Sequence, residues 1–139
     1  MDLILWRHCD AVGGTPDAIR PLTPRGQDEA RRMARWLMPR LPQDCRIVVS
    51  PAVRARQTVQ ALHRHYEIKP ALAPGASIGD VLTVGGWPAA PATTLIVSFV
   101  VLCSVLSLVQ RFSWRAYARI RPPQHQAREF MNSMLGRGK

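Results

Sequence analysis

Short apolar runs alternate with amphipathic stretches along the first hundred residues of the chain. Three runs are typical of buried strands: Leu3–Trp6, Ile47–Val49 and Thr94–Val97. Between them lie two stretches with apolar residues at helical spacing, one opening at Thr23-Pro24 and ending before Pro39 and Pro42, the other opening at Ser50-Pro51 and running to Tyr66. Strands that alternate with helices in this way predict an α/β fold with a mostly parallel sheet.

This pattern stops at residue 97. Residues 67–94 are rich in proline, glycine and alanine and predict no clear element. Residues 98–110 are apolar with no charge, and residues 111–139 are basic. We therefore divide the chain into a domain over residues 1–97 and a divergent segment over residues 98–139.

Composition places the chain among ordinary globular proteins. Its 139 residues suffice for one domain, and 47% hydrophobic with 20% charged residues excludes a disordered chain. The net charge of +10 comes largely from arginine, which supplies 17 of the 19 basic residues. A basic balance suits a phosphate or nucleic-acid partner. The tail lacks aromatic residues in a stacking pattern, so we attribute it to arginine-rich codon usage and expect no nucleic-acid partner.

The spacing of the cysteines and the sequence of the N-terminus indicate the cellular compartment in which the protein is expected. Cys9, Cys45 and Cys103 are too far apart for a disulfide framework or a zinc site. The N-terminus has an acid at Asp2 and only a short apolar run, unlike a secretory signal. We expect a cytoplasmic protein that uses no metal.

Candidate chemistry follows two of the predicted strands. Arg7-His8 comes directly after the first, and Arg54 and Arg56 follow the second. Ligands of parallel sheets bind outside the carboxyl ends of the strands. A neutral imidazole there can take a phosphoryl group, and a guanidinium can hold its oxygens. Alone, each element would more often be part of a solvated surface, and it is their combination after two strands that favours a site.

Three motifs in order resemble those of the histidine phosphatases. Residues 3–11, LILWRHCDA, resemble the RHxxA opening of that family. Residues 20–26, RPLTPRG, resemble its RPLTxxG turn, and residues 49–58, VSPAVRARQT, resemble its SPxxRAxQT helix start. The resemblance covers residues 1–97 and is strongest to the short SixA-type phosphohistidine phosphatases.

The resemblance implies a three-layer α/β/α fold like that of phosphoglycerate mutase, and a phosphoenzyme mechanism without a cofactor. His8 matches the histidine that becomes phosphorylated, and Arg7 and Arg54 match the arginines that clamp the phosphate. Arg56 falls at a variable position and is expected on the surface. The implied substrate is a partner protein that carries phosphohistidine. A small-molecule phosphatase of the same superfamily is disfavoured by the short length, which leaves no room for an insertion that caps the substrate.

The family's second histidine is missing. A GHxP-like motif should follow the third strand, but Phe99 stands at the histidine and Val101 at the proline. The other histidines do not follow a strand: His63 and His65 are expected on the solvent face of the second helix, and His125 in the basic tail.

Several explanations of this break remain open. A frame shift near codon 98 would remove the motif and change the composition together, and true divergence would do the same. Residues 93–110 would also be long enough for a membrane helix, but their polar residues and the basic residues after them disfavour a span. The alternative to an impaired phosphatase is a catalytically inactive relative that binds phosphate or a phosphoprotein.

Overall fold

The computed structural model describes residues 2–98 and the backbone of residues 117–120. Its strands are β1 (Leu3–Arg7), β2 (Arg46–Val49), β3 (Glu67–Ile68), β4 (Thr94–Ser98) and β5 (Tyr117–Ile120). Its α-helices are α1 (Pro24–Leu37), α2 (Val53–Gln60) and α3 (Ile78–Gly85). Three short 3₁₀ turns are η1 (Asp17–Ile19), η2 (Met38–Arg40) and η3 (Pro70–Leu72).

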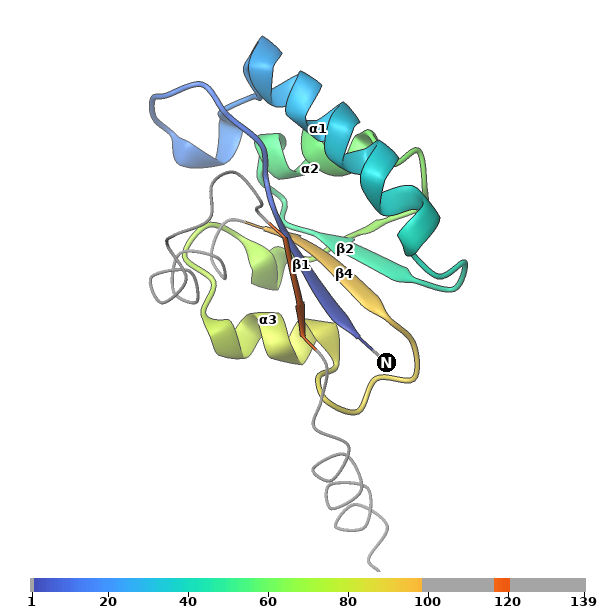
Figure 1. The fold of residues 1–139 in the computed structure, drawn as a ribbon. Coiled ribbons are helices and arrows are strands. Elements are labelled where there is room, and N and C mark those ends of the chain that lie inside the picture. Colours follow the sequence, from blue (N-terminus) through green and yellow to red (C-terminus); the bar gives the residue numbers. More distant parts are fainter. Residues whose placement is uncertain (1, 99–116, 121–139) are drawn as a thin grey trace, which may run out of the picture.

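The strands form one sheet in the order β3-β2-β4-β1-β5. All neighbours are parallel except β1 and β5, which pair antiparallel. Helices α1 and α2 cover one face of the sheet and α3 covers the other (Figure 1). The predicted three-layer α/β/α fold with a mostly parallel sheet is therefore confirmed.

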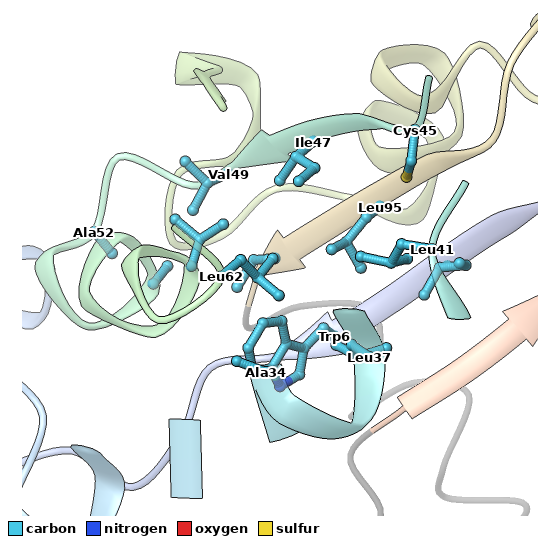
Figure 2. Close-up of a cluster of buried hydrophobic side chains, with 14 residues drawn as sticks. Trp6, Ala34, Leu37, Leu41, Cys45, Ile47, Val49, Ala52, Leu62 and Leu95 are labelled. Atoms are coloured by element: carbon cyan, nitrogen blue, oxygen red, sulfur yellow. The ribbon is translucent and has the colours of Figure 1, made fainter. Parts of the chain in front are cut away.

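Two hydrophobic cores follow from the alternation of side chains along the strands. In β1, Ile4 and Trp6 point toward α1 and α2, whereas Leu3 and Leu5 point toward α3. Figure 2 shows the larger core, where Trp6 packs with Ala34 and Leu37. Because β1 and β4 are buried on both faces, they are continuous apolar runs, which explains why the sequence pattern located them.

The first helix begins where the sequence predicts. The Thr23 hydroxyl accepts a hydrogen bond from the Gly26 amide at 3.0 Å, and Pro24 occupies the first helical position. The helix ends at Leu37, and η2 carries the chain through Pro39.

The second helix is shorter than predicted at both ends. It begins at Val53 rather than at Pro51, because the Ser50 hydroxyl accepts the Ala52 amide at 3.3 Å and forms a turn ahead of the helix.

The predicted extension of this helix to Tyr66 is also wrong. Helix α2 ends at Gln60, and His63 adopts a φ of 50°, which a right-handed helix does not contain. His63 and His65 therefore lie beyond the helix, where both are exposed, as the sequence analysis expected.

Residues 67–94, which carry no clear pattern, hold β3, η3 and α3. Helix α3 starts with a capping box, in which Ser77 and Asp80 each bond the backbone amide of the other. It ends at Gly85 and is capped by Gly86, whose φ of 67° is left-handed. Strand β5 was not predicted either, because its partner β1 lies more than a hundred residues earlier and local pattern does not record that pairing.

Of the segment 98–139, the structure describes Ser98 and the backbone of residues 117–120. Residues 94–98 of the candidate membrane stretch form β4, which lies between β2 and β1 at the centre of the sheet. Phe99, Val101 and His125 lie outside the described residues. Within the part of the chain that is described, no helix is long and apolar enough to cross a membrane.

We expect Gly26→Ala to destabilise the protein, although alanine normally favours a helix. A β-carbon at Gly26 would lie 1.9 Å from the carbonyl oxygen of Asp10, so helix and loop would have to separate. The expected loss in the free energy of unfolding is about 1–3 kcal/mol, measured by urea denaturation.

Gly79→Ala is the matched control. Gly79 lies in α3, and its β-carbon would meet nothing closer than the Ser77 hydroxyl oxygen at 3.5 Å. This variant should gain about 0.5 kcal/mol. Equal gains in both variants would show that Gly26 is not a contact point for the loop.

Candidate active site

His8 lies just beyond the carboxyl end of β1 and is 8% exposed. Its Nδ1 is 2.7 Å from the carbonyl oxygen of Cys9. A carbonyl only accepts, so Nδ1 carries the proton. Its Nε2 accepts a hydrogen bond from Nε of Arg54 at 2.9 Å, and must therefore carry the lone pair. His8 is thus a neutral imidazole in one defined tautomer.

The surroundings of His8 keep it neutral. Burial, and then the charges of Arg54, Arg7 and Arg20, lower the pKa of His8 to about 4, against the opposing effect of the Cys9 carbonyl. A proton on Nε2 would also lie against the N–H of Arg54, and the two hydrogen-bond donors would repel each other. The imidazole therefore keeps its nucleophilic lone pair in mildly acidic as well as neutral solution.

This lowered pKa should make folding sensitive to mild acid. The unfolded histidine titrates near 6.5 and the folded one near 4, so the unfolded chain binds the proton first and stability is lost as pH falls between these values. His8 should account for a loss of about 2 kcal/mol between pH 7 and pH 5.

The measurement is urea denaturation at both pH values, comparing the natural chain with His8→Gln. The variant should lose less stability on acidification. The control is His63→Gln, which alters an exposed histidine. An identical loss in the natural chain and in His8→Gln would contradict the assignment.

Arg54 reaches His8 from the helix that follows β2, a strand separated from β1 by β4 in the sheet. It is the second residue of α2, which follows β2, and it is 1% exposed. The prediction that the ends of two strands bring His8 and Arg54 together therefore matches the geometry.

Two further side chains of α2 fix its position against the loop after β1. The Thr58 hydroxyl accepts the Cys9 amide at 3.1 Å and donates to the Arg54 carbonyl at 2.8 Å. The Gln57 side-chain oxygen accepts the Leu22 amide at 2.7 Å. The sequence analysis assigned no role to either residue, although both stand in the RAxQT motif.

Arg7 and Arg56 occupy different surroundings. Arg7 ends β1 with an exposed side chain and pairs in register with Ser98 of β4. Its charge contributes to the lowered pKa of His8. Arg56 is half-buried rather than on the surface as expected, and its Nε is buried without a hydrogen-bond partner among the described residues. The helix packs more closely against its surroundings than a solvated face would.

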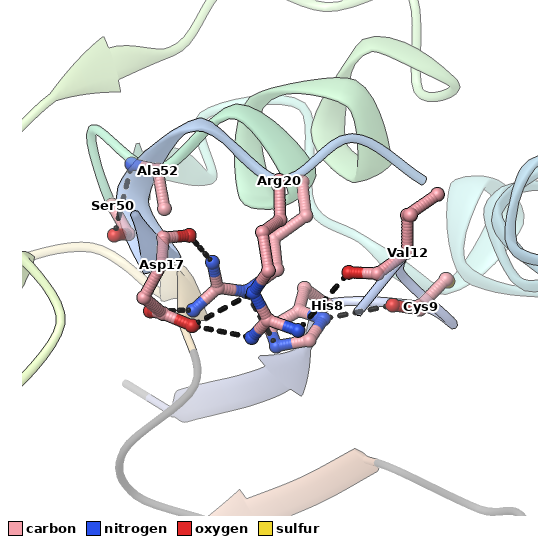
Figure 3. A network of polar contacts seen from close by, with 8 residues as sticks. His8, Cys9, Val12, Asp17, Arg20, Ser50 and Ala52 are labelled. Atoms are coloured by element: carbon pink, nitrogen blue, oxygen red, sulfur yellow. Dashed lines mark hydrogen bonds and ion pairs between the residues drawn. The ribbon is translucent and has the colours of Figure 1, made fainter. Parts of the chain in front are cut away.

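Asp17 and Arg20 complete the polar cluster, and the sequence analysis missed both roles. Asp17 belongs to η1, in a loop whose sequence suggested only turns. Its carboxylate oxygen Oδ2 lies 2.6 Å from Nη2 of Arg54, and its other oxygen pairs with Arg20. Figure 3 shows Asp17, Arg20 and His8 in this network. Arg20 stands in the quoted RPLT motif, which was the available signal.

Cys9 is not a competing nucleophile. Burial raises the pKa of its thiol to about 12, so the reactive thiolate is scarce at neutral pH. Among the residues described here, no group of three or more His, Cys, Asp or Glu side chains could hold a metal ion. The chemistry available at this cluster is that of an imidazole lone pair surrounded by guanidinium groups.

A lone-pair imidazole at a strand end, beside a buried arginine, in an α/β/α fold, is the arrangement of the histidine phosphatases. Residues 3–75 match the model of the histidine phosphatase superfamily, branch 1. The chain belongs to this superfamily.

The similarity extends to SixA proteins. The chain is 38% identical over 88 residues to the phosphohistidine phosphatase SixA of Escherichia coli, a match that covers 58% of this chain and 55% of that protein. A SixA structure complexed with tungstate is 31% identical, with a TM-score of 0.61 over 77% of this chain and 74% of that one. The putative phosphohistidine phosphatase SixA from Nakamurella multipartitia is 26% identical, with a TM-score of 0.66 over 85% and 82% of the two chains.

The chain spans about half the length of the curated relatives that it matches. The match to the superfamily model ends at residue 75, before β4. The superfamily and the fold are therefore established.

Proposed function

We propose that this protein hydrolyses phosphohistidine on a partner protein through a phospho-His8 intermediate. The observation that carries the proposal is the hydrogen-bond pattern of His8. The carbonyl of Cys9 accepts from Nδ1, so the lone pair lies on Nε2, where it accepts from Nε of Arg54 and can attack once that hydrogen bond is released. The relationship to SixA, described as a protein histidine phosphatase, supports phosphohistidine as the substrate class.

Two displacements at phosphorus would complete the reaction. In the first, Nε2 of His8 attacks phosphorus while the bond between phosphorus and the imidazole of the partner breaks. The leaving ring takes up a proton from solvent, and phospho-His8 keeps its proton on Nδ1 as an imidazolium. In the second, water attacks phospho-His8, releasing inorganic phosphate and a proton and restoring the neutral imidazole. The transferring group carries negative charge on its peripheral oxygens, so positioned positive charge accounts for most of the catalysis.

Arg54 and Arg7 would supply that charge. Nε–H of Arg54 donates a hydrogen bond to Nε2 of His8. When the lone pair on Nε2 is used for attack, the same N–H can donate to a phosphoryl oxygen instead. Arg7 ends β1 with an exposed side chain, which leaves its charge accessible to a phosphoryl group. Free thiols at Cys9 and Cys45 suit a reducing compartment, so we place this activity in the cytoplasm.

An inactive relative that binds a phosphoprotein without turnover is the second candidate. Phe99 favours it, because phenylalanine at the position of the family's second histidine cannot donate a hydrogen bond to phosphate. The two candidates differ in whether a covalent phosphohistidine forms on this chain.

The test uses the full chain and a histidine-containing carrier protein phosphorylated with phosphoramidate. Turnover would release inorganic phosphate, and acid-labile, alkali-stable phosphate on His8 would be found by rapid quench and mass spectrometry. A serine-phosphorylated carrier is the control for substrate class. Binding of the phosphohistidine carrier without a labelled His8 would support the inactive relative instead.

A further inference from the structure

The guanidinium of Arg54 is held on two sides. Its Nε donates to His8, as described above, while Nη1 donates to the backbone carbonyl of Asp17 at 2.5 Å and Nη2 to the Asp17 carboxylate at 2.6 Å. The outer edge of the guanidinium thus rests on one residue of the loop, through both its backbone and its side chain. Arg54 itself is almost fully buried.

Asp17 is in turn held by a second arginine. Arg20 lies three residues later, and its Nε donates to the Asp17 carboxylate at 2.9 Å while its Nη2 pairs with the same oxygen. Arg20 Nη1 also donates to the carbonyl of Val12 at 3.1 Å, which ties the two sides of the loop together. The Asp17 carboxylate is therefore fixed between two guanidinium groups, although its side chain is 45% exposed.

We propose that Asp17 is a positioning residue for the reaction proposed above, which sets the orientation of Arg54 so that Nε–H faces Nε2 of His8. An arginine side chain has several rotatable bonds, and a single contact to His8 leaves the plane of its guanidinium free to turn. Two acceptors on the outer edge remove that freedom. The guanidinium is then oriented before the phosphoryl group arrives.

The negative charge of Asp17 suits a positioning role and excludes a role as a general acid. Hydrogen bonds from Arg54 and then Arg20 lower the pKa of the Asp17 carboxyl, so it is ionised at neutral pH. It therefore does not carry the proton that a departing imidazole needs. The competing hypothesis is that the carboxylate occupies the place of phosphate on Arg54 and inhibits binding, which predicts tighter phosphate binding when the charge is removed.

The test is Asp17→Asn in the full chain, which keeps the shape of the side chain and removes its charge. We expect kcat on the phosphohistidine carrier to fall about ten- to a hundredfold, with KM changed less than about threefold. The affinity for inorganic phosphate, measured by calorimetry, should stay the same or weaken. Asp28→Asn is the matched control, because Asp28 pairs with Arg31 three residues along an exposed helix face.

A readout that does not need phosphatase activity separates this proposal from the proposed function. The Nε–H of Arg54 should give a slowly exchanging signal in ¹H–¹⁵N NMR spectra, assigned by its loss in Arg54→Lys. That signal should broaden or vanish in Asp17→Asn and persist in Asp28→Asn. The signal decides the proposal even if the natural chain shows no turnover.

A persistent Arg54 signal in Asp17→Asn would overturn the positioning role. So would an unchanged kcat in that variant, or tighter phosphate binding with undiminished turnover. Equal thermal midpoints of the natural and variant chains would show that the loss of the signal is local and not a result of unfolding.

Discussion

Replacing His8 with alanine is expected to abolish phosphate release from a phosphohistidine carrier and from an aryl phosphate. The substitution removes the attacking lone pair on Nε2, and no other described histidine follows a strand. The rate typically falls on the order of 10⁴-fold or more when the nucleophile of a group of cooperating catalytic residues is removed. Labelled phosphate on the chain should disappear with it.

The controls for this experiment are His63→Ala and His65→Ala, which remove exposed histidines beyond α2 and should leave turnover unchanged. His8→Ala also leaves the N–H of Arg54 without its acceptor. Circular dichroism and the thermal midpoint should therefore be recorded, and His8→Gln should be tested beside it. Full activity in folded His8→Ala would refute the phosphoenzyme mechanism.

Restoring the missing motif is expected to raise turnover by a hundred- to a thousandfold. The change is Ser98→Gly, Phe99→His and Val101→Pro, which rebuilds the GHxP-like run of the resemblance. Ser98 ends β4 opposite Arg7 of β1, and position 99 comes directly after Ser98 in the sequence. One additional donor to the transferring group is typically worth about 3–4 kcal/mol in the transition state.

The matched control carries Ser98→Gly and Val101→Pro but keeps Phe99. It separates the effect of the histidine from that of a changed backbone, and its turnover should stay at the low level expected of the natural chain. Unchanged turnover in the soluble, folded triple variant would show that Phe99 does not stand at the missing position. Normal turnover in the natural chain would refute the idea of an incomplete site.

Local signals in the sequence were sufficient for the central strands, for the start of α1 and for the place of His8. Strands β1 and β4 are buried on both faces and so are uniformly apolar, which makes them visible without any knowledge of their neighbours. The cap of α1 involves Thr23 and Gly26, three residues apart, and is equally local. His8 and Arg54 could be assigned to one edge because parallel strands present their carboxyl ends together.

Only the tertiary structure decided the details that make this edge chemically specific. The tautomer of His8 is fixed by the neighbouring Cys9 carbonyl together with Arg54, 46 residues away, and Arg54 is in turn held by Asp17, 37 residues away. Strand β5 likewise depends on β1 for its pairing. The sequence by itself determined which chemical groups stand at the strand ends, because burial and capping act over a few residues. Which atom of each group faces which was decided by contacts between distant segments, and local pattern does not record these.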